Sequence, residues 1–264
     1  MLKLTQVSKT FNPGTINEKR ALKSIDLHLK PGDFVTVIGG NGAGKSTMLN
    51  AVAGVWPVDE GSVVIDGTDV TGMPEHVRAK YIGRVFQDPM TGTAPNMQIE
   101  ENLALASRRG RKRGLRWGVT NAEREEYHEK LKILGLGLED RLTAKVGLLS
   151  GGQRQALTLL MAALRRPKLL LLDEHTAALD PATAKKVLEI TDMLIEQNQL
   201  TTLMITHNMK DAIRHGNRLI MMNEGRIIFD VSGEEKSKLT KADLMDKFAE
   251  IAGAGLESDE ILLS

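Results

Sequence analysis

Cysteine is absent from the 264-residue sequence. The chain therefore has no disulfide bond, no thiolate nucleophile and no cysteine-based zinc or iron–sulfur site. This absence does not identify a redox compartment, although it agrees with a cytoplasmic location. Any catalytic or metal site has to be built without thiols.

An excess of charge of one sign is also absent. The 35 Lys and Arg residues balance 34 Asp and Glu residues and leave a formal net charge of +1. Nucleic-acid binders and acidic tails carry a strong bias, which this sequence lacks. A polyanion would therefore have to bind at a local site.

Long apolar runs are missing as well. No uncharged apolar stretch reaches the roughly 18 residues of a membrane-spanning helix. The N-terminal residues, Met1 to Gln6, lack the basic, apolar and small-residue segments of a signal peptide. If a membrane is involved, we expect the chain to reach it through partner proteins.

The pattern that is present alternates short β-rich apolar runs with helical periodicity. It predicts an α/β protein whose helices cover a largely parallel sheet. Three apolar strands are expected at residues 34–38, 168–172 and 202–206, each followed closely by polar groups. Ligands bind beyond the carboxyl ends of the strands in open α/β sheets, so the three polar ends are expected to converge on one site.

Two further regions surround this core. Alternating residues at 2–29 and 62–70 predict an antiparallel β layer, and the segment 88–149 is expected to be mostly helical. Within that segment, residues 125–134 have apolar positions at helical spacing, while Gly110 and Gly114 interrupt the stretch before them. No internal repeat is visible, so one such unit is expected rather than two.

A glycine-rich loop at residues 39–47 matches the pattern G-x-x-x-x-G-K-[ST], with a predicted strand before it and a helix after it. Inward-pointing N–H groups and the positive N-terminal end of the helix suit a polyphosphate. Lys45 is expected to reach the outer phosphates, and the Ser46 hydroxyl to ligate Mg²⁺. By itself, the loop indicates only that a nucleoside triphosphate is bound. Its predicted binding residues are Gly39, Gly40, Asn41, Gly42, Ala43, Gly44, Lys45, Ser46 and Thr47.

An acidic pair ends the second apolar strand. Side chains alternate along a strand, so Asp173 and Glu174 are expected to point to different sides and to have different roles. We expect Asp173 to hold Mg²⁺ through its water shell, and Glu174 to orient and deprotonate the water that attacks the terminal phosphate. An acidic pair that merely begins a turn is the alternative.

His207 follows the third strand. Taken alone, a histidine at a strand end is more often a hydrogen-bonded surface group than a functional one. Beside the other motifs, His207 becomes a candidate to contact the γ-phosphate or to fix the attacking water. No function is expected for His175, which directly follows Glu174.

A second helix suited to an anion begins with the sequence Leu-Ser-Gly-Gly-Gln at residues 149–153. Ser150 is a natural N-cap, and the two glycines allow another backbone or an anion to approach closely. The amphipathic helix is expected to continue to Arg166 and to stop before Pro167. One ATP molecule need not use both of these helix ends from one chain.

In this order, the motifs resemble those of the ABC (ATP-binding cassette) ATPases, whose signature is the Leu-Ser-Gly-Gly-Gln string upstream of the acidic strand. The resemblance covers residues 4–231. It implies a P-loop NTPase core of mostly parallel sheet with flanking helices, an antiparallel β layer and a helical subdomain. The implied parts of this single cassette are the core and β layer at 1–87 and 150–231, the helical subdomain at 88–149 and a helical tail at 232–264.

The resemblance also implies roles for matching residues. Phe11 would stack on adenine, Gln87 would ligate Mg²⁺ and sense a membrane partner, and Asp180 would communicate across a dimer. Phe11 stands where tyrosine is commoner, and His175 replaces a frequent proline. The signature residues that would bind the γ-phosphate of ATP held by the other subunit are Ser150, Gly151 and Gly152, with Gln153 beside them.

The resemblance predicts an ATPase that uses ATP and Mg²⁺ in a head-to-tail homodimer, or paired with a homologous cassette. Integral membrane permease subunits on other chains, and an extracytoplasmic solute-binding protein, would be its partners at the cytoplasmic face of the membrane. Residues 92–96 and 173–176 resemble cassettes of amino-acid-type importers, so uptake of an amino-acid-like solute is predicted.

A soluble ABC ATPase of iron–sulfur cofactor assembly is the alternative. A DNA-repair or chromosome-organising ATPase is disfavoured, because no long heptad insertion separates the phosphate loop from the signature. No nucleic-acid partner is therefore expected.

Two features remain outside these motifs. A basic cluster at residues 108–116 is expected to be a solvated loop, with contact to anionic lipid headgroups as the alternative. The tail after Val231 is expected to contain a helix at 239–251 and to be either regulatory or merely terminal.

Overall fold

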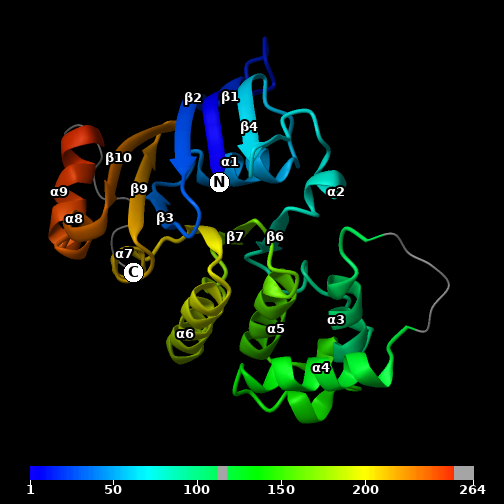
Figure 1. Ribbon diagram of the computed structural model, residues 1–264. Helices are drawn as coiled ribbons and strands as arrows, with labels where there is room; N and C mark the ends of the chain where they lie inside the picture. Colours follow the sequence, from blue (N-terminus) through cyan, green and yellow to red (C-terminus); the bar gives the residue numbers. More distant parts are fainter. Residues whose placement is uncertain (112–117, 253–264) are drawn as a thin grey trace. The chain divides into compact units, whose positions relative to one another are not determined.

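The computed structural model describes residues 1–111 and 118–252, and the chain falls into two compact units (Figure 1). Unit 1 combines Met1–Arg78 with the chain from Thr201 onward, and unit 2 is the continuous segment Ala79–Leu200. Both units contain strands and helices, which confirms the predicted α/β class.

A four-stranded antiparallel sheet forms one layer of unit 1, with the strand order β2-β1-β4-β5. In β1, Leu4 pairs with Leu27 on one side and Val63 on the other, and all three side chains are buried. This sheet is the antiparallel layer that the alternating residues predict. Its strands are β1 (Leu2–Phe11), β2 (Lys19–Leu29), β4 (Glu60–Ile65) and β5 (Thr68–Asp69).

The other strands of unit 1 lie side by side in the order β10-β9-β3-β8. β3 (Phe34–Gly39) runs parallel to β8 (Thr201–Ile205) and to β9 (Arg218–Asn223), and β10 (Arg226–Ser232) returns antiparallel to β9. Every residue of β8 is buried, which agrees with its run of three apolar residues, Leu203, Met204 and Ile205. Because β3 and β8 are parallel, the segments that follow them lie at the same edge.

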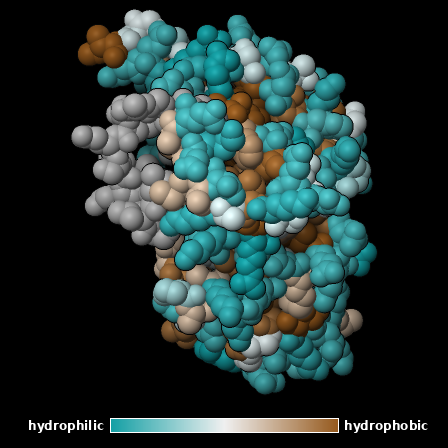
Figure 2. All heavy atoms as spheres, turned by 90° about the vertical axis from the view of Figure 1, so that its left-hand side faces the viewer, coloured by the Kyte–Doolittle hydropathy of each residue, from teal (hydrophilic) through white to brown (hydrophobic). Residues whose placement is uncertain are grey.

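Helix α9 (Lys241–Ala252) closes a hydrophobic core in unit 1. Leu244 of α9 is fully buried, and Phe248 packs against the same cluster, which includes Ile38 of β3. Figure 2 views the molecule from the side where α9 lies in Figure 1; hydrophilic side chains cover most of this face, and hydrophobic ones show between them. The helix predicted at 239–251 is thus present. The helices of unit 1 are α1 (Lys45–Ala53), α2 (Glu75–Arg78), α7 (Met209–Arg214), α8 (Gly233–Ser237) and α9 (Lys241–Ala252).

A buried arginine closes the C-terminal end of α1. Arg78 is 1% exposed, and its Nη1 donates to the carbonyl oxygens of Ala51 at 2.8 Å and Val52 at 2.9 Å. Its Nε donates to the Met73 carbonyl at 2.8 Å. Burial lowers the pKa of Arg78. The guanidinium therefore satisfies carbonyl groups that a helix end leaves without intrahelical partners.

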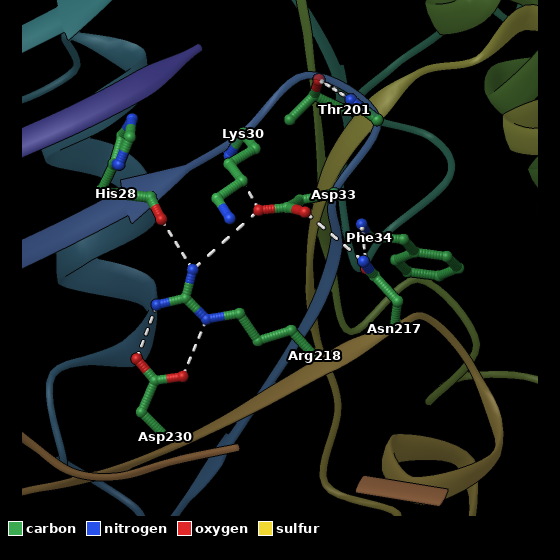
Figure 3. Close-up of polar contacts among 9 residues, drawn as sticks. His28, Lys30, Asp33, Phe34, Thr201, Asn217, Arg218 and Asp230 are labelled. Carbon is green, nitrogen blue, oxygen red and sulfur yellow. Dashed lines mark hydrogen bonds and ion pairs between the residues drawn. The ribbon is translucent and has the colours of Figure 1, made fainter. Parts of the chain in front are cut away.

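A polar network around Arg218 joins four segments of unit 1 (Figure 3). The guanidinium binds the Asp230 carboxylate with two hydrogen bonds, of 2.7 and 2.6 Å, and donates to the His28 carbonyl at 2.6 Å. Nη1 also lies 4.0 Å from Oδ2 of Asp33. The hydrogen bonds with Asp230 raise the pKa of Arg218. The network holds together the end of β2, the turn before β3, and strands β9 and β10.

Unit 2 is built on two parallel strands, β6 (Ile82–Val85) and β7 (Leu169–Asp173), with Val85 paired to Leu172. Helix α5 (Gly151–Ala163) packs on β6 so closely that a Cβ on Gly83 would lie 2.5 Å from the Ala162 carbonyl oxygen. Helix α6 (Pro181–Asn198) contacts α5. The helix predicted to run to Arg166 therefore ends earlier, at Ala163.

The first helix of the segment 88–149 begins at residue 99, so the prediction of a mostly helical segment is wrong for residues 88–98. Residues 88–98 form turns, and the 1%-exposed Asn102 accepts from Ala94 N at 2.8 Å and donates to Gln98 O at 2.9 Å. These side-chain bonds satisfy backbone groups in place of a helix. The helices of this segment are α3 (Ile99–Ser107), α4 (Asn121–Lys132) and the 3-10 turns η1 (Glu139–Arg141) and η2 (Val146–Leu148).

The helix expected at 125–134 begins earlier, at Asn121, because a capping box precedes it. Oγ1 of Thr120 accepts from Glu123 N at 3.2 Å, and the Glu123 carboxylate accepts from Thr120 N at 2.8 Å. The two bonds satisfy backbone donors reciprocally at the start of the helix. The helix is therefore α4 and ends at Lys132.

The basic cluster at 108–116 is only partly described, since residues 112–117 lie outside the described part of the chain. Arg108 forms an ion pair with Glu123 at 3.0 Å, and Arg109 donates to the Ala162 carbonyl at the end of α5 at 3.0 Å. Burial lowers the pKa of Arg109. The prediction of a solvated loop is therefore wrong for these two arginines, which tie helices together.

Within the described residues, no helix combines the length and the apolar character that a membrane span requires.

Candidate functional site

The predicted phosphate loop connects β3 to α1 in unit 1. Gly44 is the N-cap of α1 with φ +103°, and a Cβ there would lie 2.6 Å from the Ala21 carbonyl oxygen. Gly39 has φ +148°, and a Cβ there would clash with the Met222 carbonyl oxygen. Both positions therefore require glycine. The prediction that this loop binds a polyphosphate stays a prediction.

Lys45 lies over this loop. Its Nζ donates to the carbonyl oxygens of Gly39 at 2.7 Å and Gly40 at 3.0 Å, and the residue is 5% exposed. A buried cation is thus held against the loop that would receive a polyphosphate. Ser46 is exposed and Thr47 is half-buried, so the Ser46 hydroxyl is accessible at the first turn of α1.

Phe11 ends β1 and contacts a second aromatic ring. Its centroid lies 4.9 Å from that of Trp56 with an interplanar angle of 83°, an edge-to-face arrangement. Nζ of Lys9 lies 5.8 Å from the Phe11 centroid and is paired to Asp59 at 2.7 Å. Sequence reasoning identified Phe11 and missed Trp56, because their separation in the chain gave no sign of the contact.

Replacing Phe11 by alanine is expected to weaken ATP binding about tenfold, because stacking of a base on an aromatic ring contributes about 1–3 kcal/mol. Titration calorimetry with ATP measures the change. Phe11→Tyr keeps the ring and is the matched control, with an expected affinity close to that of the unaltered protein. Equal affinities for Phe11→Ala and Phe11→Tyr would contradict the stacking role.

His207 follows β8, at the same edge as the phosphate loop that follows β3. Thr206 N donates to the Val37 carbonyl at 3.2 Å, and Asn208 N donates to Thr206 Oγ1 at 3.1 Å. The Asn208 side chain then caps α7 by accepting from Lys210 N at 2.9 Å. His207 is half-buried between these anchored residues. Unit 1 therefore brings His207 and the phosphate loop to one edge of its sheet.

Asp173 is the last residue of β7 in unit 2, and Gln87 follows the neighbouring strand β6. Since Val85 pairs with Leu172 in parallel, the two predicted metal ligands lie at one edge. Nη2 of Arg84 lies 3.8 Å from Oδ2 of Asp173, and the Arg84 guanidinium covers the Phe86 ring at 4.5 Å. Sequence reasoning missed Arg84, whose only signal is its position in a short strand.

Glu174 follows Asp173 with φ +45°, a left-handed backbone that a non-glycine residue rarely adopts. Ala177 N donates to the Glu174 carbonyl at 3.0 Å and closes a turn. A turn does begin at Glu174, as the alternative interpretation of the acidic pair predicts. The left-handed conformation nevertheless sets Glu174 apart from an ordinary turn residue.

The signature sequence begins α5, and its cap is the predicted one. Ser150 Oγ accepts from Gln153 N at 3.3 Å, and Gln153 Oε1 accepts from Ser150 N at 3.2 Å. A Cβ on Gly152 would overlap Cγ2 of Thr183, and a Cβ on Gly151 would lie 3.4 Å from Leu179. Ser150 and Gly151 are exposed. The glycines thus serve close packing within unit 2 and also leave the helix start accessible.

Asp180 has a local structural role in unit 2. Its Oδ1 accepts from Thr183 N at 3.1 Å and caps α6, in which Pro181 is the first residue. Hydrogen bonds from the Thr183 side chain and backbone lower the pKa of Asp180. Asp180 therefore fixes the start of α6. Its role across a dimer stays a prediction.

Gln155 is a further residue that sequence reasoning missed. It is fully buried, and its Nε2 donates to the Phe86 carbonyl at 3.2 Å. Phe86 directly precedes Gln87, so one side chain of the signature helix α5 anchors the segment that carries Gln87. The amphipathic pattern of this helix does not indicate that Gln155 binds the Phe86 carbonyl.

The predicted metal ligands suit Mg²⁺ by their chemistry. The Ser46 hydroxyl, the Gln87 amide and the Asp173 carboxylate all offer oxygen donors, which Mg²⁺ prefers. In the described part of the chain, no three His, Asp or Glu residues gather into a metal-binding cluster. As donor types, a carboxylate, an amide and a hydroxyl oxygen have the chemistry that Mg²⁺ accepts alongside phosphate oxygens and water.

Comparison with known proteins identifies relatives over almost the whole chain. A tyrosine transport ATP-binding protein of Clostridioides difficile is 42% identical over 253 residues, which are 94% of this chain and 98% of that protein. A spermidine/putrescine import ATP-binding protein of Haemophilus influenzae is 33% identical, and the match spans 89% of this chain and 59% of that protein.

Solved structures of ATP-binding cassettes share the fold of this chain. A dimeric ATP-binding cassette bound to ADP and Pi in a post-hydrolysis state matches with a TM-score of 0.75 and 32% identity, over 88% of this chain and 98% of the other. The family model of the ABC transporters matches residues 22–177, which include the phosphate loop, the signature and the acidic pair. The chain belongs to the ABC transporter family and is one of its ATP-binding cassettes, an ATPase.

Proposed function

We propose that this chain energises the uptake of an amino-acid-like solute, with tyrosine as the first candidate, through permease subunits on separate membrane chains. The observation that supports this most directly is the 42% identity, over almost the full length of both proteins, to a tyrosine transport ATP-binding protein. The relatives reported above are transport ATPases, which does not favour the iron–sulfur assembly alternative.

For the ATPase reaction, we propose roles that follow from the chemistry of the residues. Phe11 stacks on adenine, and the phosphate loop with Lys45 and Ser46 binds the phosphates and Mg²⁺. Mg²⁺, when bound with ATP, neutralises charge that develops on the phosphates. Glu174 takes the proton of the attacking water, and His207 positions the γ-phosphate or that water.

The ligand set at the strand ends of unit 2 completes this assignment. Asp173 would hold the metal ion through its water shell, and Gln87 would add an amide oxygen. Arg84 lies beside Asp173 and keeps that carboxylate oriented through their 3.8 Å ion pair. The bond from Gln155 to the Phe86 carbonyl links α5 to the segment that carries Gln87. A shift of α5 would therefore move Gln87.

We further propose that two cassettes, identical or homologous, pair head to tail. Ser150, Gly151, Gly152 and Gln153 of one cassette would then bind the γ-phosphate of ATP on the other, and Asp180 would lie close to the partner. The exposed Ser150 and Gly151 at the start of α5 support this pairing. In this proposal the chain is a single cassette that comprises a core, a helical subdomain and a tail. It would associate with the membrane by binding the permease. A solute-binding protein would deliver the solute to the permease.

Transport by the reconstituted complex tests this proposal. The chain is coexpressed with a candidate permease and purified in detergent, and proteoliposomes are assayed for ATP-dependent uptake of labelled tyrosine. Leucine and spermidine serve as comparison solutes, and Glu174→Gln serves as the inactive control. Uptake of tyrosine supports the proposal, uptake of spermidine alone corrects the solute, and a soluble complex without any membrane protein contradicts transport.

A further inference from the structure

His175 is a buried histidine beside the strained Glu174. It is 2% exposed, and its Nε2 lies 3.0 Å from Oγ1 of Thr191 in α6. Thr191 is fully buried, and its hydroxyl donates to the Val187 carbonyl at 2.8 Å. The residue that follows the acidic pair is therefore tied to the interior of a long helix.

The direction of the hydrogen bond follows from the number of protons. A threonine hydroxyl has one proton, and Thr191 gives it to the Val187 carbonyl, so Oγ1 has only lone pairs left for His175. Nε2 of His175 must then carry a hydrogen and donate it. The pair thus selects one ring tautomer and one ring orientation.

This bond restrains the backbone of Glu174. A left-handed φ of +45° at a non-glycine residue persists only where the surroundings hold it. On one side, Glu174 continues from the paired strand β7. On the other side, it shares a peptide group with His175, whose ring is fixed to α6. The 3.0 Å bond from Ala177 N to the Glu174 carbonyl closes the turn between them.

We propose that His175 is a positioning residue for ATP hydrolysis: its Nε2–H bond to Thr191 holds Glu174 in the left-handed conformation that aims the carboxylate at the attacking water. This inference rests on the proposed role of Glu174 as the base. Because His175 acts through the backbone and does not contact the nucleotide, its loss lowers the rate of the chemical step more than the affinity for ATP.

Steady-state ATP hydrolysis by the full chain tests the inference with variants of nearly the same shape. Thr191→Val removes the acceptor, and His175→Leu removes the donor. Each is expected to lower kcat about tenfold, as for the loss of one buried hydrogen bond. KM for ATP is expected to stay within about twofold of its original value. His175→Gln and Thr191→Ser, which keep a donor and an acceptor, are expected to recover most of kcat.

Thr158 provides a matched control in the same unit. It is 2% exposed and donates to the Arg154 carbonyl at 2.9 Å within α5, as Thr191 does within α6. Thr158→Val therefore removes the same kind of intrahelical bond without removing a bond to His175, and kcat is expected to be retained. In the double variant His175→Leu/Thr191→Val, the loss is expected to be no larger than in either single variant.

The inference is overturned if Thr191→Val, folded by circular dichroism, keeps kcat within about twofold of the original value. An equal loss in Thr158→Val overturns it too, as does a rise in KM that accounts for the lower activity. If His175→Leu does not fold, Thr191→Val decides alone. Normal hydrolysis by Glu174→Gln would refute the proposed base, whereas an inactive Glu174→Gln beside a fully active Thr191→Val refutes only the role of His175.

Discussion

Glu174→Gln is expected to lower the rate of ATP hydrolysis by about 10²–10⁴-fold, the loss expected for a positioned general base. Glutamine keeps the size and the hydrogen-bonding edge of glutamate but cannot take a proton from water. ATP binding is expected to remain, because the proposed function assigns the phosphates to the phosphate loop and gives Glu174 only the water. Phosphate release at saturating ATP measures the rate, and titration calorimetry measures the affinity.

Glu125→Gln is the matched control for this experiment, since Glu125 is an exposed residue of α4. Its hydrolysis rate is expected to equal that of the unaltered chain. Because ATP would remain bound without turnover, Glu174→Gln with ATP is also expected to accumulate as a dimer in size-exclusion chromatography. Near-normal turnover in Glu174→Gln would remove Glu174 from the catalytic role.

Gly44→Ala is expected to weaken ATP binding by at least about tenfold, because a strained backbone alone costs about 1–3 kcal/mol. The added Cβ would lie 2.6 Å from the Ala21 carbonyl oxygen and 3.3 Å from Gly225 Cα, at a φ of +103°. Neither neighbour is a flexible side chain, so the loop itself has to move. A displaced loop would no longer present its N–H groups where the proposed function places the phosphates. Calorimetry with ATP gives the affinity.

Gly67→Ala separates this effect from backbone strain in general. Gly67 has φ +77°, and a Cβ there would meet no atom within 4 Å. Its variant is expected to lose some thermal stability and to bind ATP normally. If Gly44→Ala bound ATP as tightly as Gly67→Ala, the close packing of the loop against Ala21 would have no part in nucleotide binding.

The sequence was most informative where burial and chemistry coincide. The strands predicted at 34–38, 168–172 and 202–206 lie within one residue of β3, β7 and β8, because each is buried almost throughout and ends in a polar segment. Ser150 was recognisable as an N-cap from local sequence alone. Such features depend on neighbours in the chain, so a single sequence reveals them.

Other features depend on residues far apart in the chain. The edge-to-face contact of Phe11 with Trp56, the ion pair of Arg84 with Asp173 and the link from Gln155 to Phe86 all form only on folding. The same holds for Asn102, whose bonds to the preceding backbone replace the helix that was expected before residue 99. No local pattern marks these contacts, because tertiary packing selects them.

His175 is the clearest case of a residue set aside on sequence grounds. A lone histidine after an acidic pair has no pattern that distinguishes it from a surface group. Its burial and its bond to Thr191, sixteen positions further along the chain, become visible only when α6 folds back beside the turn. The proposed positioning role of His175 therefore depends on contacts that the sequence does not reveal.

The Arg218 network bears on the order in which the chain folds during synthesis. It joins His28 and Asp33 to Arg218 and Asp230, so it forms only after residue 230 has left the ribosome. β3 likewise pairs with its neighbouring strands of unit 1, β8 and β9, only after both have been synthesised. Unit 2 is a continuous segment and is complete in the chain by Leu200. The nascent chain can therefore complete the unit with the signature helix while the unit with the phosphate loop still lacks its last strands.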